Sequence, residues 1–141
     1  MRHTVVAYGE MLWDLLPAGA TLGGAPLNFV YRVHSLGERG LLASRVGRDE
    51  LGERALRAAR ELGLDTRLIQ RDGTHPTGTV PVRFDARGNP DFTIVPEVAY
   101  DYIEPDAALE QAVAQAQVLC FGTLAQRSAV SRGTLWRLRE A

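Results

Sequence analysis

A regular alternation of apolar runs with amphipathic segments constrains this chain more than any other feature. Residues 4–8 form a short apolar, β-branched run typical of a buried strand, and residues 41–47 are interpreted as a second strand. Between them, residues 26–35 predict a buried helix, and residues 49–62 predict an amphipathic helix that begins at an aspartate cap. The order strand, helix, strand, helix predicts parallel βαβ units with helices over the faces of the sheet.

The middle of the chain departs from this alternation. Residues 67–70 are expected to form a third core strand, whereas residues 77–85 and 92–95 alternate apolar and polar side chains on either side of a polar turn. This pattern predicts a hairpin inserted among the βα units, and Pro81 places it at a sheet edge or in a small separate sheet. Such a hairpin is either a flap over a site or an extension of the sheet, and the pattern alone leaves both open.

The β/α order then returns, with a helix predicted over residues 105–116, a buried strand over 118–124 and a last helix running to the C-terminus. Cys120 lies in this apolar strand and is interpreted as a buried, inert thiol. The 141 residues contain no internal repeat, low-complexity tract or flexible linker, so we expect a single domain.

Composition excludes several classes of function. The formal net charge is −1 with both signs mixed along the chain, so no basic patch for nucleic acid is expected. A single cysteine excludes an internal disulfide and a multi-cysteine metal site, and no other set of residues has metal-ligand spacing. No run is long enough to span a membrane, and no signal peptide is recognisable. We therefore expect a cytoplasmic protein without a membrane or nucleic-acid partner.

The best-known nucleotide and hydrolase motifs are also missing. The chain has no GxxxxGK[ST] loop, no GxGxxG after the first strand and no GxSxG turn. The chemistry that remains is hydrogen bonding. Asp14 is one carboxylate within the apolar residues 11–16, so it lies either at a strand end facing a cleft or bonded to nearby backbone N–H groups.

The stretch Gly23-Gly24-Ala25-Pro26-Leu27-Asn28 precedes the first helix. Pro26 suits the first turn of a helix, and Asn28 then lies where free N–H groups and a partial positive charge are found. Alone, the stretch is either a helix N-terminus that meets a polar ligand or a loop that feeds a helix. Together with Asp14, it suits a ligand rich in hydroxyl groups, because a carboxylate accepts hydrogen bonds and an amide both donates and accepts them.

These residues resemble the N-terminal signature of the ribokinase-like (PfkB-type) carbohydrate kinases, and the GGAPxN form is most similar to the fructokinase branch. The positions that carry the resemblance are Gly9-Glu10, Asp14, residues 23–28, Leu36-Gly37, Arg45-Val46-Gly47, Asp49, Gly52 and residues 76–80. The resemblance covers essentially the whole chain from Val5 onward. It implies an α/β fold, namely a ribokinase-like αβα sandwich with a parallel-rich sheet and a small β lid formed near residues 77–95.

The same resemblance implies a sugar site. Asp14 and Asn28 would bond sugar hydroxyls, Gly23 and Gly24 would line the same pocket, and Phe92 would be an apolar contact from the lid. It leaves the sugar undefined, with fructose suggested by the branch. No metal ligand and no catalytic residue is expected among the 141 residues.

Three departures qualify the resemblance. Val30 stands where the signature usually has a smaller residue, and residues 17–23 are so few that a lid strand usual there is expected to be reduced or absent. The second family signature, a DTxGAGD-like segment with the catalytic base, does not occur in residues 1–141. We therefore expect the N-terminal part of a sugar kinase domain.

The parent reaction implied is transfer of the γ-phosphoryl group of ATP to a sugar hydroxyl, with Mg²⁺. Neither ATP nor Mg²⁺ is expected to bind these residues tightly, and they are expected to be inactive alone. The alternative hypothesis is a non-catalytic binding or assembly module that pairs with itself or another chain through the lid or an exposed sheet edge.

Overall fold

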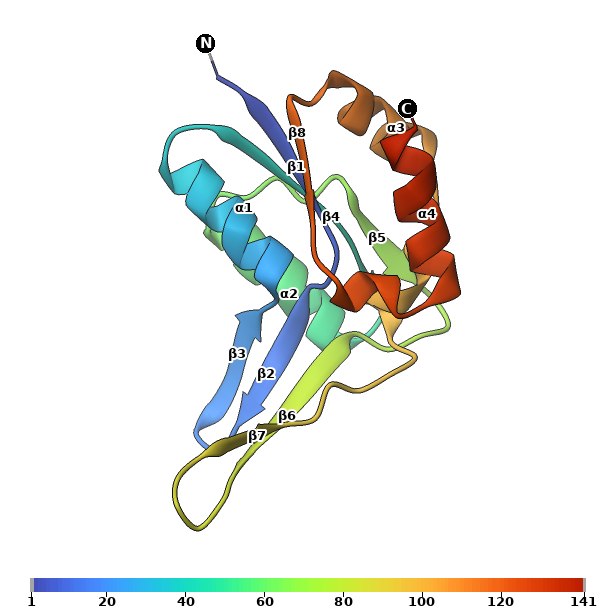
Figure 1. The fold of residues 1–141 in the computed structure, drawn as a ribbon. Helices are drawn as coiled ribbons and strands as arrows, with labels where there is room; N and C mark the ends of the chain where they lie inside the picture. Colours follow the sequence, from blue (N-terminus) through green and yellow to red (C-terminus); the bar gives the residue numbers. More distant parts are fainter. Residues whose placement is uncertain (1, 141) are drawn as a thin grey trace.

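The computed structural model describes residues 2–140, which form two β-sheets with helices packed on the larger one (Figure 1). The larger sheet is parallel throughout and has the strand order β5-β4-β1-β8, while the smaller sheet has the order β3-β2-β6-β7. The strands are β1 (Thr4–Tyr8), β2 (Leu12–Leu16), β3 (Gly19–Gly23), β4 (Arg39–Gly47), β5 (Ile69–Asp72), β6 (Gly78–Phe84), β7 (Pro90–Phe92) and β8 (Val118–Phe121).

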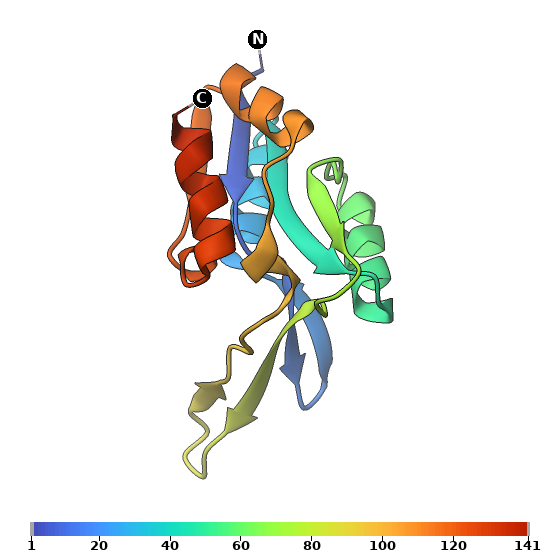
Figure 2. The ribbon, with the colours of Figure 1, turned by 90° about the vertical axis from the view of Figure 1, so that its right-hand side faces the viewer.

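Helices cover both faces of the larger sheet, as Figure 2 shows from the side. The helices are α1 (Ala25–Ser35), α2 (Glu50–Glu61), α3 (Ala107–Gln115) and α4 (Ala129–Arg139), with short 3₁₀ turns η1 (Ala99–Tyr102) and η2 (Leu124–Gln126). Side chains alternate along the strands, so Ala7 and Leu42 pack with residues of α1 and α2, whereas Val6 and Leu41 pack with residues of α3 and α4. The predicted αβα arrangement with parallel βαβ units is confirmed.

The first helix packs closely on β4. Val30, the residue that departs from the family signature, is fully buried above Gly40. A Cβ atom on Gly40 would come within 2.9 Å of both the Val30 side chain and the Val30 carbonyl oxygen. The absence of a side chain on Gly40 of β4 therefore leaves room for the larger side chain of Val30 on α1.

The smaller sheet contains a strand that we expected to be reduced or absent. Residues Gly19–Gly23 form β3, which pairs antiparallel with β2 over all five residues from Leu12↔Gly23 to Leu16↔Gly19. The expectation from segment length was wrong because the turn between the two strands is very short. Gly19 follows that turn with a φ of +139°, a backbone conformation open mainly to glycine, and this lets pairing start at once.

Pro81 lies inside the smaller sheet rather than at an edge. Strand β6 pairs in parallel with β2 and antiparallel with β7, so the prediction of a small separate sheet is confirmed and the edge alternative is wrong. The Pro81 carbonyl accepts a bond of 3.0 Å from Thr93, just past the end of β7. The missing proline N–H therefore falls where the ladder with β7 ends, and it costs little.

Three predicted strands differ from their expected bounds. The buried strand expected at residues 118–124 is β8 at Val118–Phe121, and its residues are half-buried or exposed. The third core strand, expected at residues 67–70, is β5 at Ile69–Asp72. The strand expected at residues 92–95 is β7 at Pro90–Phe92, after which the backbone crosses to η1. Cys120 is half-buried rather than buried, because β8 is an edge strand of the larger sheet. No helix in the described part of the chain is long and apolar enough to cross a membrane.

Candidate functional site

The topology of the larger sheet marks one place for a ligand. From β1 the chain passes through the smaller sheet and α1 to β4 on one side, whereas β8 pairs with the other side of β1 and is preceded by α3 on the opposite face. In open α/β sheets, ligands bind beyond the carboxyl ends of the strands where the order reverses in this way. Gly9 and Glu10 follow β1 at that point, and Gly122 follows β8.

The N-terminus of α1 faces the same region. The helix begins after Gly24, which has a φ of +112° and no side chain to cap the free N–H groups, and Pro26 lies in the first turn. The backbone N–H of Asn28 donates to the Gly24 carbonyl oxygen at 3.0 Å. The side chain of Asn28 is exposed and makes no hydrogen bond within residues 2–140, so its amide is available to a ligand.

Asp14 lies in the middle of β2, opposite Thr21 of β3 and Val80 of β6. Its carboxylate is half-buried and has no hydrogen-bond partner in the described part of the chain, and burial raises its pKa. Both alternatives from the sequence were therefore wrong, since Asp14 is neither at a strand end nor bonded to backbone N–H groups. Pairing of β2 on both sides engages those backbone groups, and the side chain is left free.

Both glycines lie in close contacts, and at Gly24 the neighbour is backbone, so a side chain there is excluded. A Cβ on Gly23 would lie 2.7 Å from Oδ2 of Asp14, and a Cβ on Gly24 would lie 2.4 Å from the carbonyl oxygen of Glu10. The β2–β3 register thus places Asp14 against the turn that leads into α1. The structure brings together three of the five predicted site residues: Asp14, Gly23 and Gly24.

The other two predicted residues lie near this place without contacting Asp14 through a hydrogen bond. Phe92 ends β7 opposite Val82 and is 56% exposed. Val82 lies two residues beyond Val80, the partner of Asp14, so Phe92 and Asp14 share one face of the smaller sheet. Asn28 comes from α1 instead. The predicted residues therefore come from the smaller sheet, from the turn before α1 and from α1 itself.

Sequence reasoning missed the polar groups buried beneath the smaller sheet. Glu10 is only 6% exposed, and its Oε2 atom has no hydrogen-bond partner within residues 2–140. Burial raises the pKa of Glu10, and the backbone amides of Glu10 and Ala25 and the charge of Arg127 oppose that shift. The available signals were the place of Glu10 directly after an apolar strand and its place in the family resemblance, neither of which showed that its side chain is buried.

Arg127 joins the segment that leaves the smaller sheet to the helices. Its guanidinium donates to both carboxylate oxygens of Asp101 at 2.8 Å, to the Val95 carbonyl oxygen at 2.7 Å and to the Tyr100 hydroxyl at 3.3 Å. Burial raises the pKa of Tyr100 to about 12, and its ring fills the space beside Gly78. The bidentate pair of Arg127 with Asp101 fixes the segment that follows β7 against the helices.

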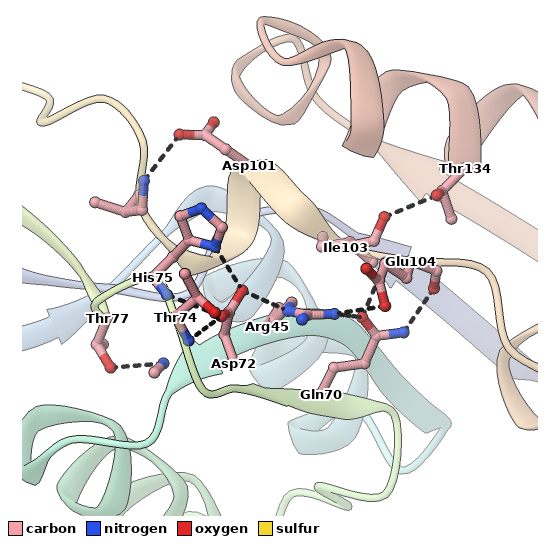
Figure 3. Close-up of polar contacts among 12 residues, drawn as sticks. Arg45, Gln70, Asp72, Thr74, His75, Thr77, Asp101, Ile103, Glu104 and Thr134 are labelled. Atoms are coloured by element: carbon pink, nitrogen blue, oxygen red, sulfur yellow. Dashed lines mark hydrogen bonds and ion pairs between the residues drawn. The ribbon is translucent and has the colours of Figure 1, made fainter.

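A second polar cluster fixes the segment that joins β5 of the larger sheet to β6 of the smaller sheet. Figure 3 shows the Asp72 carboxylate between Arg45 and His75, and it accepts bonds of 2.7 and 2.8 Å from the backbone N–H groups of Thr74 and His75. Burial of Asp72 disfavours its charge, but the His75 and Thr74 amides, the His75 ring and Arg45 outweigh burial and bring its pKa to about 2. The Asp72 carboxylate is buried and already accepts from Arg45, from the Thr74 amide and from the amide and ring of His75, so we assign this cluster a structural role rather than a ligand site.

The comparison with known families decides the identity of the fold. Residues 18–137 match the pfkB family carbohydrate kinase profile. The chain belongs to the pfkB family of carbohydrate kinases. The resemblance inferred from the signature residues is thereby confirmed.

Individual relatives agree with this assignment. The pfkB-family chain is 31% identical over 116 residues to the sugar kinase PH1459 of Pyrococcus horikoshii, covering 82% of this chain and 37% of that protein. It is 28% identical over 136 residues to fructokinase-1 of Zea mays, covering 87% of this chain and 42% of the relative. The chain therefore spans less than half the length of these two relatives.

Solved structures confirm the ribokinase-like fold. The crystal structure of PH1459, described as an uncharacterized sugar kinase, superposes with a TM-score of 0.85 and 28% identity over 96% of this chain and 50% of that one. The Halothermothrix orenii fructokinase superposes with a TM-score of 0.81 and 26% identity, over 96% of this chain and 52% of that one. PH1459 has also been crystallised in complex with ATP.

Proposed function

We propose that this pfkB-family chain is the sugar-binding part of a fructokinase-like kinase. The observation that carries the proposal is the Asp14 carboxylate, which is half-buried, has no partner within residues 2–140 and packs against the Gly23-Gly24 turn before α1. Water can serve this half-buried carboxylate when no ligand is bound, so a ligand that displaces the water must itself donate hydrogen bonds to Asp14. Adjacent sugar hydroxyls are donors of the right kind.

Each predicted residue has a role in this proposal. Asp14 accepts from sugar hydroxyls, and Asn28 both donates and accepts at the first turn of α1. Gly23 and Gly24 bring backbone close to the ligand, and Phe92 covers an apolar face of the sugar. The smaller sheet, including the β6–β7 hairpin near residues 77–95, then acts as the lid.

The parent reaction would be transfer of the γ-phosphoryl group of ATP to a sugar hydroxyl, and the support for ATP comes from the family and from the ATP complex of PH1459. Within residues 2–140, no group of three or more acidic, histidine or cysteine side chains is placed to hold a metal ion. No role in holding Mg²⁺ is therefore assigned to these residues. The DTxGAGD-like segment is not among the 141 residues, so we propose that they do not phosphorylate sugar by themselves.

Isothermal titration calorimetry with fructose tests the sugar site. We expect the wild-type chain to bind fructose. Asp14→Asn should bind at least about tenfold more weakly, since a hydrogen bond to a charged group contributes about 1.5–3 kcal/mol. Asp91→Asn is the matched control, because Asp91 is exposed on β7 and makes no hydrogen bond in the described part of the chain. Equal fructose affinity in all three proteins, or no binding by the wild type, would contradict the proposal. Titration with ribose defines the sugar class.

A second candidate function, an assembly module, rests on the outer edge of β8. No further strand pairs there within residues 2–140, and Val118 and Phe121 are 48% and 42% exposed. Gln117 donates to Thr4 of the β1 side, so the next residue, Val118, directs its backbone N–H to the free edge. Light scattering tests this candidate: a dimer that Val118→Pro converts to a monomer favours it, and a wild-type monomer rejects it.

A further inference from the structure

Glu10 occupies an unusual position for a carboxylate. It follows Gly9 directly after β1, at the reversal of strand order, and its side chain is 6% exposed. Its Oε2 atom is fully covered and has no hydrogen-bond partner within residues 2–140. A buried polar group without a partner is expensive, so a carboxylate kept here calls for a function beyond packing.

The backbone around Glu10 is locked against the start of α1. A Cβ on Gly24 would lie 2.4 Å from the Glu10 carbonyl oxygen and 3.4 Å from its Cγ atom. A Cβ on Gly9 would lie 2.8 Å from the Pro26 ring. The link from β1 to β2 and the first turn of α1 therefore touch along two successive residues, and any movement of one displaces the other.

The charges around Glu10 come from three other elements. The Ala25 amide at the N-terminus of α1 and the Arg127 guanidinium favour the ionised carboxylate, while burial disfavours it. Tyr100 of η1 is close enough that Glu10 contributes to raising its pKa, and Asp101 already neutralises Arg127 in a bidentate pair. Gly24 has no side chain that could cap the first turn of α1, and that turn contains no acidic residue. The negative charge of Glu10 therefore provides the electrostatic complement to this end of the helix.

We propose that Glu10 is a positioning residue of the sugar site, which fixes the first turn of α1 and the Gly24 backbone relative to Asp14. The inference rests on the proposed sugar-binding function. Glu10 acts through the Ala25 amide and through its contact with Gly24, and it does not touch the ligand. When Glu10 loses its charge, the first turn of α1 loosens and the sugar pocket loses its shape.

The substitution Glu10→Gln tests this, because it keeps the shape of the side chain and removes the charge. We expect fructose affinity to fall about tenfold near neutral pH, because the buried negative charge beside the first turn of α1 is removed. Burial raises the pKa of Glu10, so wild-type affinity should fall on acidification at a higher pH than an ordinary glutamate would give. Asp14 also titrates, and the difference between wild type and Glu10→Gln at each pH isolates the Glu10 contribution.

The matched control is Glu61→Gln. Glu61 is exposed at the end of α2 and has no hydrogen bond or ion pair of its side chain within residues 2–140. It should leave affinity and its pH profile unchanged. Wild-type affinity and an unchanged pH profile in Glu10→Gln would overturn the inference, since a merely structural residue would change the melting temperature alone.

Hydrogen exchange provides a readout that needs neither a variant nor a bound sugar. The protection factor of the Asn28 amide, which donates to the Gly24 carbonyl oxygen at the start of α1, should fall in the wild-type chain as Glu10 is protonated, while those of α2 stay constant. Unchanged protection at the start of α1 across that range would overturn the positioning role even if Glu10→Gln failed to fold. If the wild type bound no sugar at any pH but exchange at α1 followed Glu10, the proposed function would fail and the positioning role of Glu10 toward α1 would stand.

Discussion

Replacing Asp72 by asparagine is expected to destabilise the chain by about 2 kcal/mol near neutral pH. Asp72 is 2% exposed and ends β5, where the chain turns toward the smaller sheet. It accepts from Arg45 at 2.8 Å and from the backbone and ring of His75 at 2.8 and 3.0 Å. An asparagine keeps the size of the side chain but loses the charge that these donors stabilise.

The magnitude follows from the pKa of Asp72, which its donors lower from 3.8 to about 2. A difference of nearly two pKa units between the unfolded and folded chain corresponds to about 2 kcal/mol of stability. Because the folded pKa is the lower one, this stability is fully present above the unfolded value and is lost as the pH falls toward about 2. In Asp72→Asn, this part of the acid sensitivity should be absent.

Urea unfolding followed by tryptophan fluorescence measures the effect. The wild-type chain and Asp72→Asn should differ near neutral pH, and the two curves of unfolding free energy should converge as the pH falls from 3.8 toward about 2. Asp91→Asn, an exposed aspartate in β7, should follow the wild type throughout. A constant difference between wild type and Asp72→Asn at every pH would refute the reasoning, because the loss would then come from packing and not from charge.

Two further substitutions test the close contacts. Gly24→Ala should cost about 1–3 kcal/mol for its φ of +112°, with an added cost from the backbone carbonyl 2.4 Å from the new Cβ. Gly88→Ala, with a φ of +82° and open space, isolates the backbone cost, and equal urea midpoints for the two variants would contradict the clash. Tyr8→Phe removes a buried hydroxyl that donates to the Ser131 carbonyl oxygen at 2.7 Å, and it should lower the unfolding free energy by about 1–3 kcal/mol in urea titrations. An unchanged midpoint would show that the hydroxyl is not needed there.

Local signals in the sequence were sufficient for several elements. The β-branched run at Thr4–Tyr8 is β1 with the same bounds, because a strand buried on both faces needs continuous apolar residues. Asp49 caps α2 and accepts from the Gly52 amide at 2.8 Å, as its side chain and position predicted. The alternation of these elements was enough to predict parallel βαβ units, and the signature residues were enough to identify the family.

Features that depend on pairing between distant segments could not be predicted from the sequence. Strand β3 and the interior place of Pro81 follow from which strands lie beside β2, and no local pattern encodes that choice. Asp14 became a free carboxylate only because β2 is paired on both sides.

By itself, the sequence determined the α/β class, the family and the turn before α1, since these rest on side-chain periodicity and on residues close together in the chain. Only the tertiary structure decided that Glu10 is buried beside that turn and that Arg127 pairs with Asp101. Their burial and charge environment arise from elements that are separated along the chain, where folding and not sequence spacing sets the distances.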